Sequence, residues 1–165
     1  MFVSNPVKVV HDNYFTRKSA WQDIELFIPR GKTIWEPLFD EQSNSASHLK
    51  DLGFEVIWKN QDFFQSNEGD IVVSNCPYSL KKEVITRLKE LNKPFILLMP
   101  STCLHTKHFL ELFRDERIQL IIPYTKRQFD KLGDDGNFVD RKDNCSFYTL
   151  YICWKMDLPR DVIFI

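Results

Sequence analysis

Residues 70–79 have the sequence Asp70-Ile71-Val72-Val73-Ser74-Asn75-Cys76-Pro77-Tyr78-Ser79. The β-branched run Ile71–Val73 is typical of a strand buried on both faces of a parallel sheet. From Leu80 to Leu91 apolar residues recur every three or four positions, which predicts a helix capped by Ser79. A strand therefore gives way to a helix at Asn75–Tyr78. In an open α/β sheet, ligands bind at that edge.

The composition is typical of one folded domain. The 165 residues are 43% hydrophobic and 14% aromatic, enough to bury a substantial core. The formal net charge of −1 argues against strong unspecific binding of nucleic acid, which depends on neutralising phosphates. The first residues lack the apolar core of a signal peptide, and no apolar run is long enough to span a bilayer. We expect a single domain, residues 1–165, that does not contact a membrane.

The four cysteines are spread along the chain without a Cys-x-x-Cys pair. This spacing is typical of reduced thiols in an intracellular protein, and we expect the chain in the cytoplasm or the nucleus. Cys103, His105 and His108 are close together in the sequence, but a metal site needs further ligands and none are obvious. We therefore expect no metal.

Residues 33–58 have the pattern of a β-α-β unit. Thr33–Pro37 predicts a strand, a helix is expected to end near Leu52 with Gly53 after it, and Glu55–Trp58 predicts a second strand. Before this unit, residues 1–18 predict an irregular N-terminal arm. A helix from Ser19 to Phe27, capped by Ser19, is expected to follow the arm.

The second half of the chain continues the alternation. Buried strands are expected at Phe95–Pro100 and Ile118–Pro123, with a helix at Ser101–Phe113 between them. A polar segment then precedes a long final strand, Cys145–Trp154. Strands that alternate with helices predict an α/β fold with a mostly parallel central sheet and helices on both of its faces.

Asn75-Cys76-Pro77-Tyr78 resembles the Asn-Pro-Pro-Tyr signature of the S-adenosylmethionine-dependent N6-adenine methyltransferases, with Cys76 in place of the first proline. An exocyclic amine is a poor nucleophile because its lone pair is delocalised into the ring. The resemblance implies that the side-chain oxygen of Asn75 and the carbonyl of Cys76 each accept one N–H and localise that lone pair, while Tyr78 stacks on a base taken out of its helix. The alternative is an ordinary strand-to-helix turn.

The same resemblance implies a cofactor site and a three-layer Rossmann-like methyltransferase fold whose last long strand is antiparallel. The residues that would contact S-adenosylmethionine are Tyr14, Thr16, Glu36, Phe39, Asp40, Asn60, Asp62 and Phe63. Arg17 replaces a proline of the family's arm, and Asp40 and Gln42 replace glycines of its cofactor loop. Lys59 stands where an acidic residue usually holds the ribose hydroxyls, and a lysine cannot accept a hydrogen bond. Alternatively, the arm packs on the sheet and Asp62-Phe63 forms a turn that leads into the core.

Basic pairs provide the expected contacts to phosphates. The candidate substrate-binding residues are Lys81, Lys82, Lys126 and Arg127, and residues 130–144 correspond to the substrate-side loop of the family. The charges of Arg141 and Lys142 are more simply explained as solvated. Two hypotheses remain open. In the first, which we favour, the chain methylates adenine N6 in DNA or RNA. In the second, it is an inactive relative that binds nucleic acid or pairs with an active partner subunit.

Overall fold

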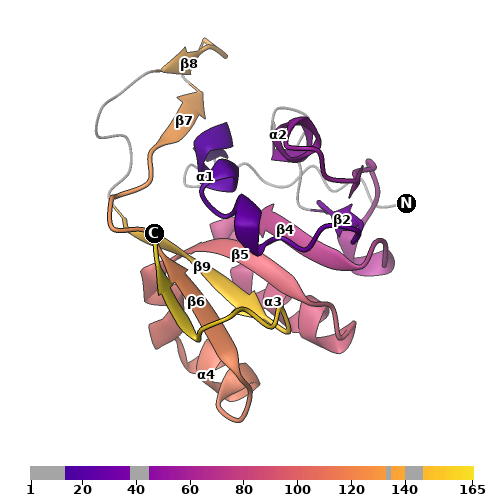
Figure 1. Ribbon diagram of the computed structural model, residues 1–165, viewed down its shortest axis with the longest axis vertical. Helices are drawn as coiled ribbons and strands as arrows, with labels where there is room; N and C mark the ends of the chain where they lie inside the picture. The colour runs from indigo at the N-terminus through magenta and orange to yellow at the C-terminus, as the bar shows by residue number, and fades with distance from the viewer. Residues whose placement is uncertain (1–13, 38–44, 133–134, 140–146) are drawn as a thin grey trace.

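The computed structural model describes residues 14–37, 45–132, 135–139 and 147–165. A seven-stranded sheet runs through the molecule in the order β10-β6-β9-β5-β4-β2-β3, and every strand is parallel to β4 except β9 (Figure 1). Its strands are β2 (Ile34–Trp35), β3 (Val56–Ile57), β4 (Ile71–Asn75), β5 (Phe95–Pro100), β6 (Ile118–Ile122), β9 (Thr149–Trp154) and β10 (Val162–Phe164). The predicted mostly parallel sheet is confirmed, and so is the antiparallel direction of the long strand.

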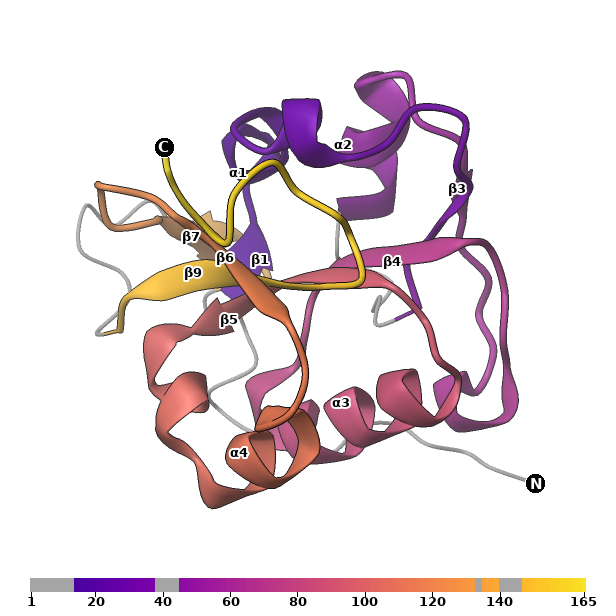
Figure 2. The same ribbon diagram turned by 60° about the horizontal axis from the view of Figure 1, so that its bottom comes forward.

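Helices cover both faces of this sheet (Figure 2). α1 (Lys18–Gln22) and α2 (Ser45–Asp51) lie on one face, and α3 (Lys81–Glu90) and α4 (Lys107–Phe113) lie on the other. Side chains of β4 alternate between the two layers: Ile71 and Val73 pack with the core residues of α1 and α2, and Val72 packs with those of α3 and α4. The three-layer α/β fold is therefore confirmed.

The strand-to-helix transition lies at the carboxyl end of β4. Asn75 is the last residue of that strand, and a short 3-10 turn, η3 (Tyr78–Leu80), leads into α3. Leu80, not the predicted Ser79, holds the N-cap position of α3. The apolar face is nevertheless the expected one, because Val84 and Leu88 are fully buried. The periodicity predicted which face is buried but not where the helix begins.

The other predicted helices are shorter than expected. The helix expected at 19–27 divides into α1 and the 3-10 turn η1 (Glu25–Phe27), and Arg17 holds the N-cap position of α1 instead of Ser19. The helix expected at 101–113 divides into η4 (Ser101–His105) and α4, whose first turn is capped by the Thr106 hydroxyl, which accepts from the N–H of Phe109. Among the described residues, no helix has the length and apolar character needed to cross a bilayer.

A second, three-stranded sheet contains part of the predicted arm. β1 (Tyr14–Thr16) pairs antiparallel with β7 (Phe129–Leu132), which pairs with β8 (Phe138–Val139). The Arg17 guanidinium, directly after β1, reinforces this pairing, because its Nε lies 2.8 Å from a carboxylate oxygen of Asp130 in β7. The expectation of irregular structure is thus wrong for residues 14–16, since their strand depends on a partner more than a hundred residues away.

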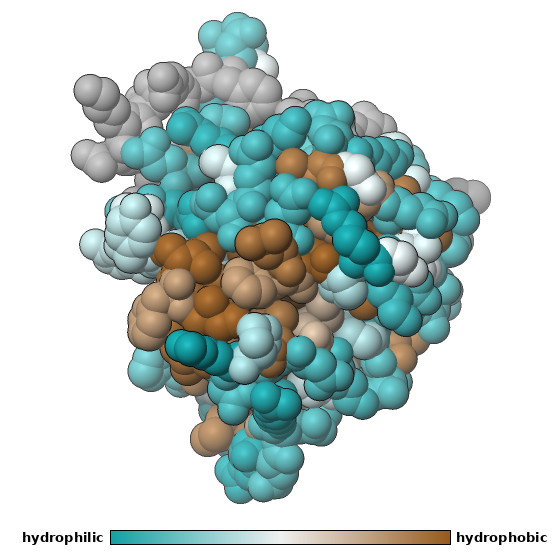
Figure 3. Space-filling view, viewed as in Figure 1, coloured by the Kyte–Doolittle hydropathy of each residue, from teal (hydrophilic) through white to brown (hydrophobic). Residues whose placement is uncertain are grey.

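The end of the chain also differs from the prediction. β9 is not the last strand: it lies between β5 and β6, and β10 follows it to pair with the outer side of β6. Ile163 packs on the core, whereas Val162 and Phe164 are exposed. Apolar side chains gather on the face of the molecule shown in Figure 3, over the region where β6, β9 and β10 lie in Figure 1.

Candidate active site

Asn75 lies at the carboxyl end of β4, beside Leu98 of β5. It follows Ile71 and Val73 on the face of the sheet that α1 and α2 cover. Its side-chain oxygen Oδ1 is buried and has no hydrogen-bond partner among the residues that the structure describes. A buried acceptor without a donor costs about 1–3 kcal/mol. The oxygen is therefore available to an N–H donor of a ligand.

Cys76 and Pro77 shape the turn that follows. The Cys76 side chain is buried in the core on the side of α3 and α4, and its Sγ lies 3.4 Å from the carbonyl oxygen of Pro77. Pro77 has φ −56° and ψ 120°, an extended conformation that proline favours. The buried thiol of Cys76 thus fixes the backbone at the position where the family has a proline, directly after Asn75.

Four aromatic rings join the motif to the arm. The Phe147 ring is 5.2 Å from that of Tyr78 and 5.5 Å from that of Tyr14, and both contacts are edge-to-face. Phe129 of β7 lies 6.0 Å from Tyr14 and 6.1 Å from Phe147. The structure therefore brings the predicted cofactor residue Tyr14 near the predicted catalytic residue Tyr78. Phe147 was not predicted; its one signal in the sequence is an aromatic residue just before the long strand.

Buried polar side chains lie near this edge of the sheet. Glu36, directly after β2, is almost fully buried, and one of its carboxylate oxygens accepts from the Ser74 hydroxyl at 2.6 Å. Thr149 begins β9 opposite Pro100, so it lies at the same sheet edge as Asn75. The hydroxyls of Thr149 and of Thr16 in β1 are buried without hydrogen-bond partners among the described residues. Of these four side chains, Thr16 and Glu36 are predicted cofactor residues.

The remaining predicted cofactor residues have different surroundings. Phe39 and Asp40 lie outside the described residues, and Asn60 is exposed. The Asp62 carboxylate accepts from the Phe64 N–H at 2.9 Å, which caps the 3-10 turn η2 (Phe63–Gln65). Phe63 is only 6% exposed and packs on Trp35, with ring centroids 5.5 Å apart. Its predicted stacking on adenine stays a prediction.

Lys59, which replaces the family's acidic residue, lies in an ion pair rather than free in solution. Its Nζ is 3.0 Å from a carboxylate oxygen of Glu68, and this contact lowers the pKa of Glu68. The pair holds two ends of the 59–68 segment together at the surface. Of Lys59 and Asn60, only Asn60 has a side chain that can accept a hydrogen bond from a ribose hydroxyl.

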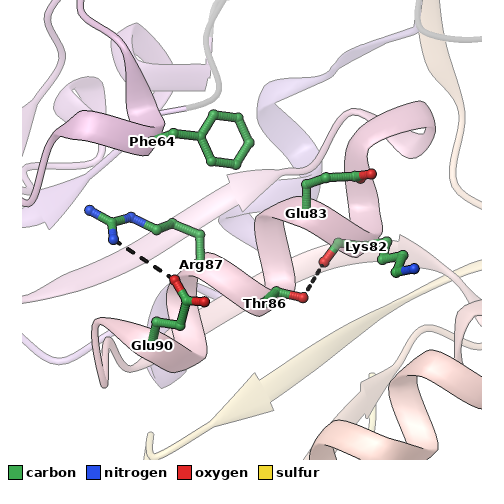
Figure 4. Close-up of a pocket in the computed structure, with 6 residues that line it drawn as sticks. All are labelled: Phe64, Lys82, Glu83, Thr86, Arg87 and Glu90. Atoms are coloured by element: carbon green, nitrogen blue, oxygen red, sulfur yellow. Dashed lines mark hydrogen bonds and ion pairs between the residues drawn. The ribbon is translucent and has the colours of Figure 1, made fainter.

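A groove of about 340 Å³ runs along α3 beside η2 (Figure 4). It is lined by Phe64, Lys82, Glu83, Thr86, Arg87 and Glu90. The Phe64 ring faces it and is 40% exposed, in contrast to the buried Phe63. The Thr86 hydroxyl donates to the Lys82 carbonyl, and Arg87 pairs with Glu90, so most polar groups of the groove are engaged within α3.

The predicted phosphate contacts are not equally accessible. Lys81 and Lys82 lie in the first turn of α3, directly after the motif. Lys126 is exposed, and its Nζ lies 5.4 Å from the ring centre of Tyr148. Arg127 has a side chain only 13% exposed and forms an ion pair with Asp23. Lys126 is thus the more accessible of the two cations in this pair.

Asn-x-Pro-Tyr at the end of a central parallel strand, in a sheet with one antiparallel strand inserted, defines a Rossmann-like methyltransferase. The family model described as adenine-specific methyltransferase EcoRI matches residues 29–147, and the chain belongs to that family. Methyl transfer to adenine is the activity of this family. The match contains the motif and β2 to β8 but not Tyr14 or Thr16. A search of curated proteins found no match.

Proposed function

We propose that this chain transfers a methyl group from S-adenosylmethionine to the N6 amine of adenine in nucleic acid. One observation carries the proposal: the buried oxygen of Asn75 without a hydrogen-bond partner among the described residues, at the carboxyl end of β4 in a chain of the adenine-specific methyltransferase family. A substrate with an N–H group would satisfy this buried acceptor, Oδ1 of Asn75, and its binding is favoured for that reason.

The chemistry assigns each residue of the motif a role. Oδ1 of Asn75 and the carbonyl oxygen of Cys76 each accept a hydrogen bond from one N–H of the amine, which localises its lone pair on nitrogen. Tyr78 stacks on the base and holds the amine in plane with these acceptors. S-adenosylmethionine would supply an electrophilic methyl group: the carbon–sulfur bond would break as the nitrogen–carbon bond forms, S-adenosylhomocysteine would leave, and one proton of the amine would be released. Transition-state charge thus develops on nitrogen next to two fixed dipoles, and such preorganised acceptors are effective in a site with little water.

The described residues fit such a cofactor at its methionine end. The Thr16 hydroxyl is buried without a partner among them, and the buried Glu36 carboxylate follows β2. A hydroxyl can donate to the methionine carboxylate, and a glutamate can accept from its ammonium. Tyr14, which the aromatic cluster places near Tyr78, would border the same space. These residues would hold the methionine end of the methyl donor.

The first prediction tests the role of Asn75. Asn75→Ala is expected to abolish transfer of radiolabelled methyl groups to adenine in DNA and RNA oligonucleotides, because one of two acceptors for the amine is removed. The urea midpoint of unfolding should not fall, since the deleted oxygen has no partner among the described residues. Asn67→Ala, in an exposed loop, is the matched control and should keep full activity. Unchanged turnover in Asn75→Ala would refute the catalytic role.

The second prediction concerns the strength of cofactor binding. We expect weak binding of S-adenosylmethionine, because Asp40 and Gln42 replace glycines and Lys59 cannot accept from a ribose hydroxyl. Isothermal titration calorimetry should show tighter binding by the double variant Asp40→Gly, Gln42→Gly. Sub-micromolar affinity of the unmodified chain would contradict this interpretation. No measurable binding by either protein would instead support an inactive relative, which acts through a partner subunit.

A further inference from the structure

Tyr148 presents a large aromatic ring to solvent close to the proposed active site. Its side chain is 66% exposed, although the residues that follow it in β9 are all buried. Its backbone is held in place, because its carbonyl oxygen accepts from the N–H of Ser101 at 2.9 Å, at the end of β5. An exposed tyrosine on a fixed backbone is a rigid, flat surface that loses little entropy on binding.

This ring is one residue away from the aromatic cluster. Phe147 contacts Tyr78, whereas Tyr148 contacts Lys126, whose Nζ lies 5.4 Å from the ring centre. Phe147 and Tyr148 are consecutive residues that directly precede β9. A base held at Tyr78 would have its neighbour in the same strand close to Tyr148, because consecutive Cα atoms are only about 3.8 Å apart.

The charges around Tyr148 are complementary to a phosphate backbone. Two segments border this end of the sheet, residues 101–110 after β5 and 123–129 after β6, and they contain lysine, arginine and histidine but no aspartate or glutamate. Arg127 is engaged with Asp23, so of these two neighbouring cations Lys126 is the exposed one. Aromatic rings combined with nearby cations are the usual means of binding single-stranded nucleic acid.

We infer that Tyr148 and Lys126 bind the nucleotide next to the target adenine, with its base stacked on the tyrosine ring and its phosphate at the lysine ammonium. The inference rests on the proposed function and specifies its substrate: the strand is bound with the neighbouring base unpaired, not as an intact duplex. Stacking of this kind tolerates any base, so Tyr148 contributes affinity without sequence preference.

The test uses fluorescein-labelled single-stranded oligonucleotides with one adenine, in DNA and RNA forms. Each has either a normal base or an abasic site on the 5′ or the 3′ side of the adenine, and affinity is measured by fluorescence anisotropy. Tyr148→Ala should weaken binding of the normal strand by roughly 5- to 150-fold, the loss typical of one stacked base. For the strand that is abasic on the stacked side, the wild type should already bind weakly, and Tyr148→Ala should cause no further loss.

Two companion variants separate stacking from general damage. Tyr148→Phe keeps the ring and should bind like the wild type. Lys126→Ala should reduce the salt dependence by about 0.7 in the slope of log affinity against log salt, the value for one phosphate contact on a single strand. Lys32→Ala, an exposed lysine that precedes β2 at the opposite edge of the sheet, should leave the slope unchanged.

The outcomes distinguish this inference from the proposed function. If the wild type methylates the strands but Tyr148→Ala binds normal and abasic strands as the wild type does, Tyr148 does not stack and the inference is wrong. If duplex is bound as tightly as the single strand, the inference also fails while the methyl transfer stands. If the wild type transfers no methyl group to any strand, the proposed function fails, whereas a loss of binding confined to normal strands in Tyr148→Ala still supports the stacking role.

Discussion

Several single polar atoms in this protein are buried without a hydrogen-bond partner among the described residues, and three of them concern the proposed site. They are Oδ1 of Asn75 and the hydroxyls of Thr16 and Thr149. Each costs about 1–3 kcal/mol if nothing pairs with it. Asn75 and Thr149 lie at the same sheet edge, and Thr16 lies in the strand that begins at Tyr14. The oxygens of Asn75 and Thr149, unpaired among the described residues, indicate that stability has been given up at this edge for binding.

The single residue His48 leads to a prediction about how the free energy of unfolding depends on pH. It lies in α2, and burial, followed by the positive charge of Lys18, lowers its pKa below the usual 6.5. The unfolded chain therefore takes up a proton near pH 6.5 that the folded chain resists, so the free energy of unfolding falls as the pH drops through this value. Urea denaturation at pH 7.5 and 5.5 should show the loss. His48→Gln should reduce it, and an unchanged difference would show that another group is responsible.

At the scale of elements, one buried glutamine holds the C-terminal strand in place. Gln119 of β6 accepts from the N–H of Leu158 at 2.8 Å and donates to the carbonyls of Leu158 and Arg160 at 3.0 and 3.1 Å. These bonds fasten the segment between β9 and β10, which has no regular structure of its own. β10 is a short edge strand that pairs only with β6 in the described sheet, so its position depends on this segment.

Gln119→Leu should therefore loosen β10 selectively. The variant leaves the N–H and carbonyl of the buried Leu158 without partners, at a cost of about 1–3 kcal/mol for each group. Amide hydrogen exchange in β10 should therefore speed up more than in β4 or β5. Arg117→Ala provides the control, because its ion pair with Asp161 is exposed and is expected to contribute less than about 1 kcal/mol. Equal acceleration of exchange in all strands would show that Gln119 stabilises the whole fold instead.

At the scale of the whole molecule, the charge distribution limits how the chain can bind nucleic acid. The net charge is −1, and many of the cations of the described residues are engaged in ion pairs, such as those of Arg17 with Asp130 and Arg127 with Asp23. The chain therefore has no excess of positive charge with which to neutralise phosphates. Affinity of the isolated chain should be modest and should depend mostly on contacts close to the motif.

Replacing both Lys81 and Lys82 by alanine tests this view. These residues lie in the first turn of α3, directly after Tyr78, and we expect the double variant to bind all sequences more weakly without a change in base preference. The salt dependence of binding should become shallower by about 0.7 in slope for each single-strand phosphate that the double variant no longer neutralises. If the wild type binds tightly and with sequence preference, and the double variant binds equally well, recognition takes place elsewhere, for example in the predicted substrate-side loop 130–144.

The amino-acid sequence by itself determined the layered α/β fold and the position of the motif. Apolar runs such as Phe95–Pro100 and the periodicity of Val84 and Leu88 are local patterns, and burial on both faces of a sheet or on one face of a helix follows directly from them. The predicted N-cap residues Ser19 and Ser79 were wrong. A serine that could cap a helix competes with 3-10 turns and with contacts from neighbouring elements, and the local sequence pattern does not show these.

Only the tertiary structure decided which distant residues meet. β1 exists because Tyr14–Thr16 pairs with β7, and β9 lies between β5 and β6 although it follows both in the chain. The contact of Phe147 with Tyr78, and the absence of a partner for Oδ1 of Asn75 among the described residues, likewise arise from segments far apart in sequence. Strand pairing, burial and the satisfaction of hydrogen bonds are properties of the folded chain, because each depends on atoms that only folding brings together.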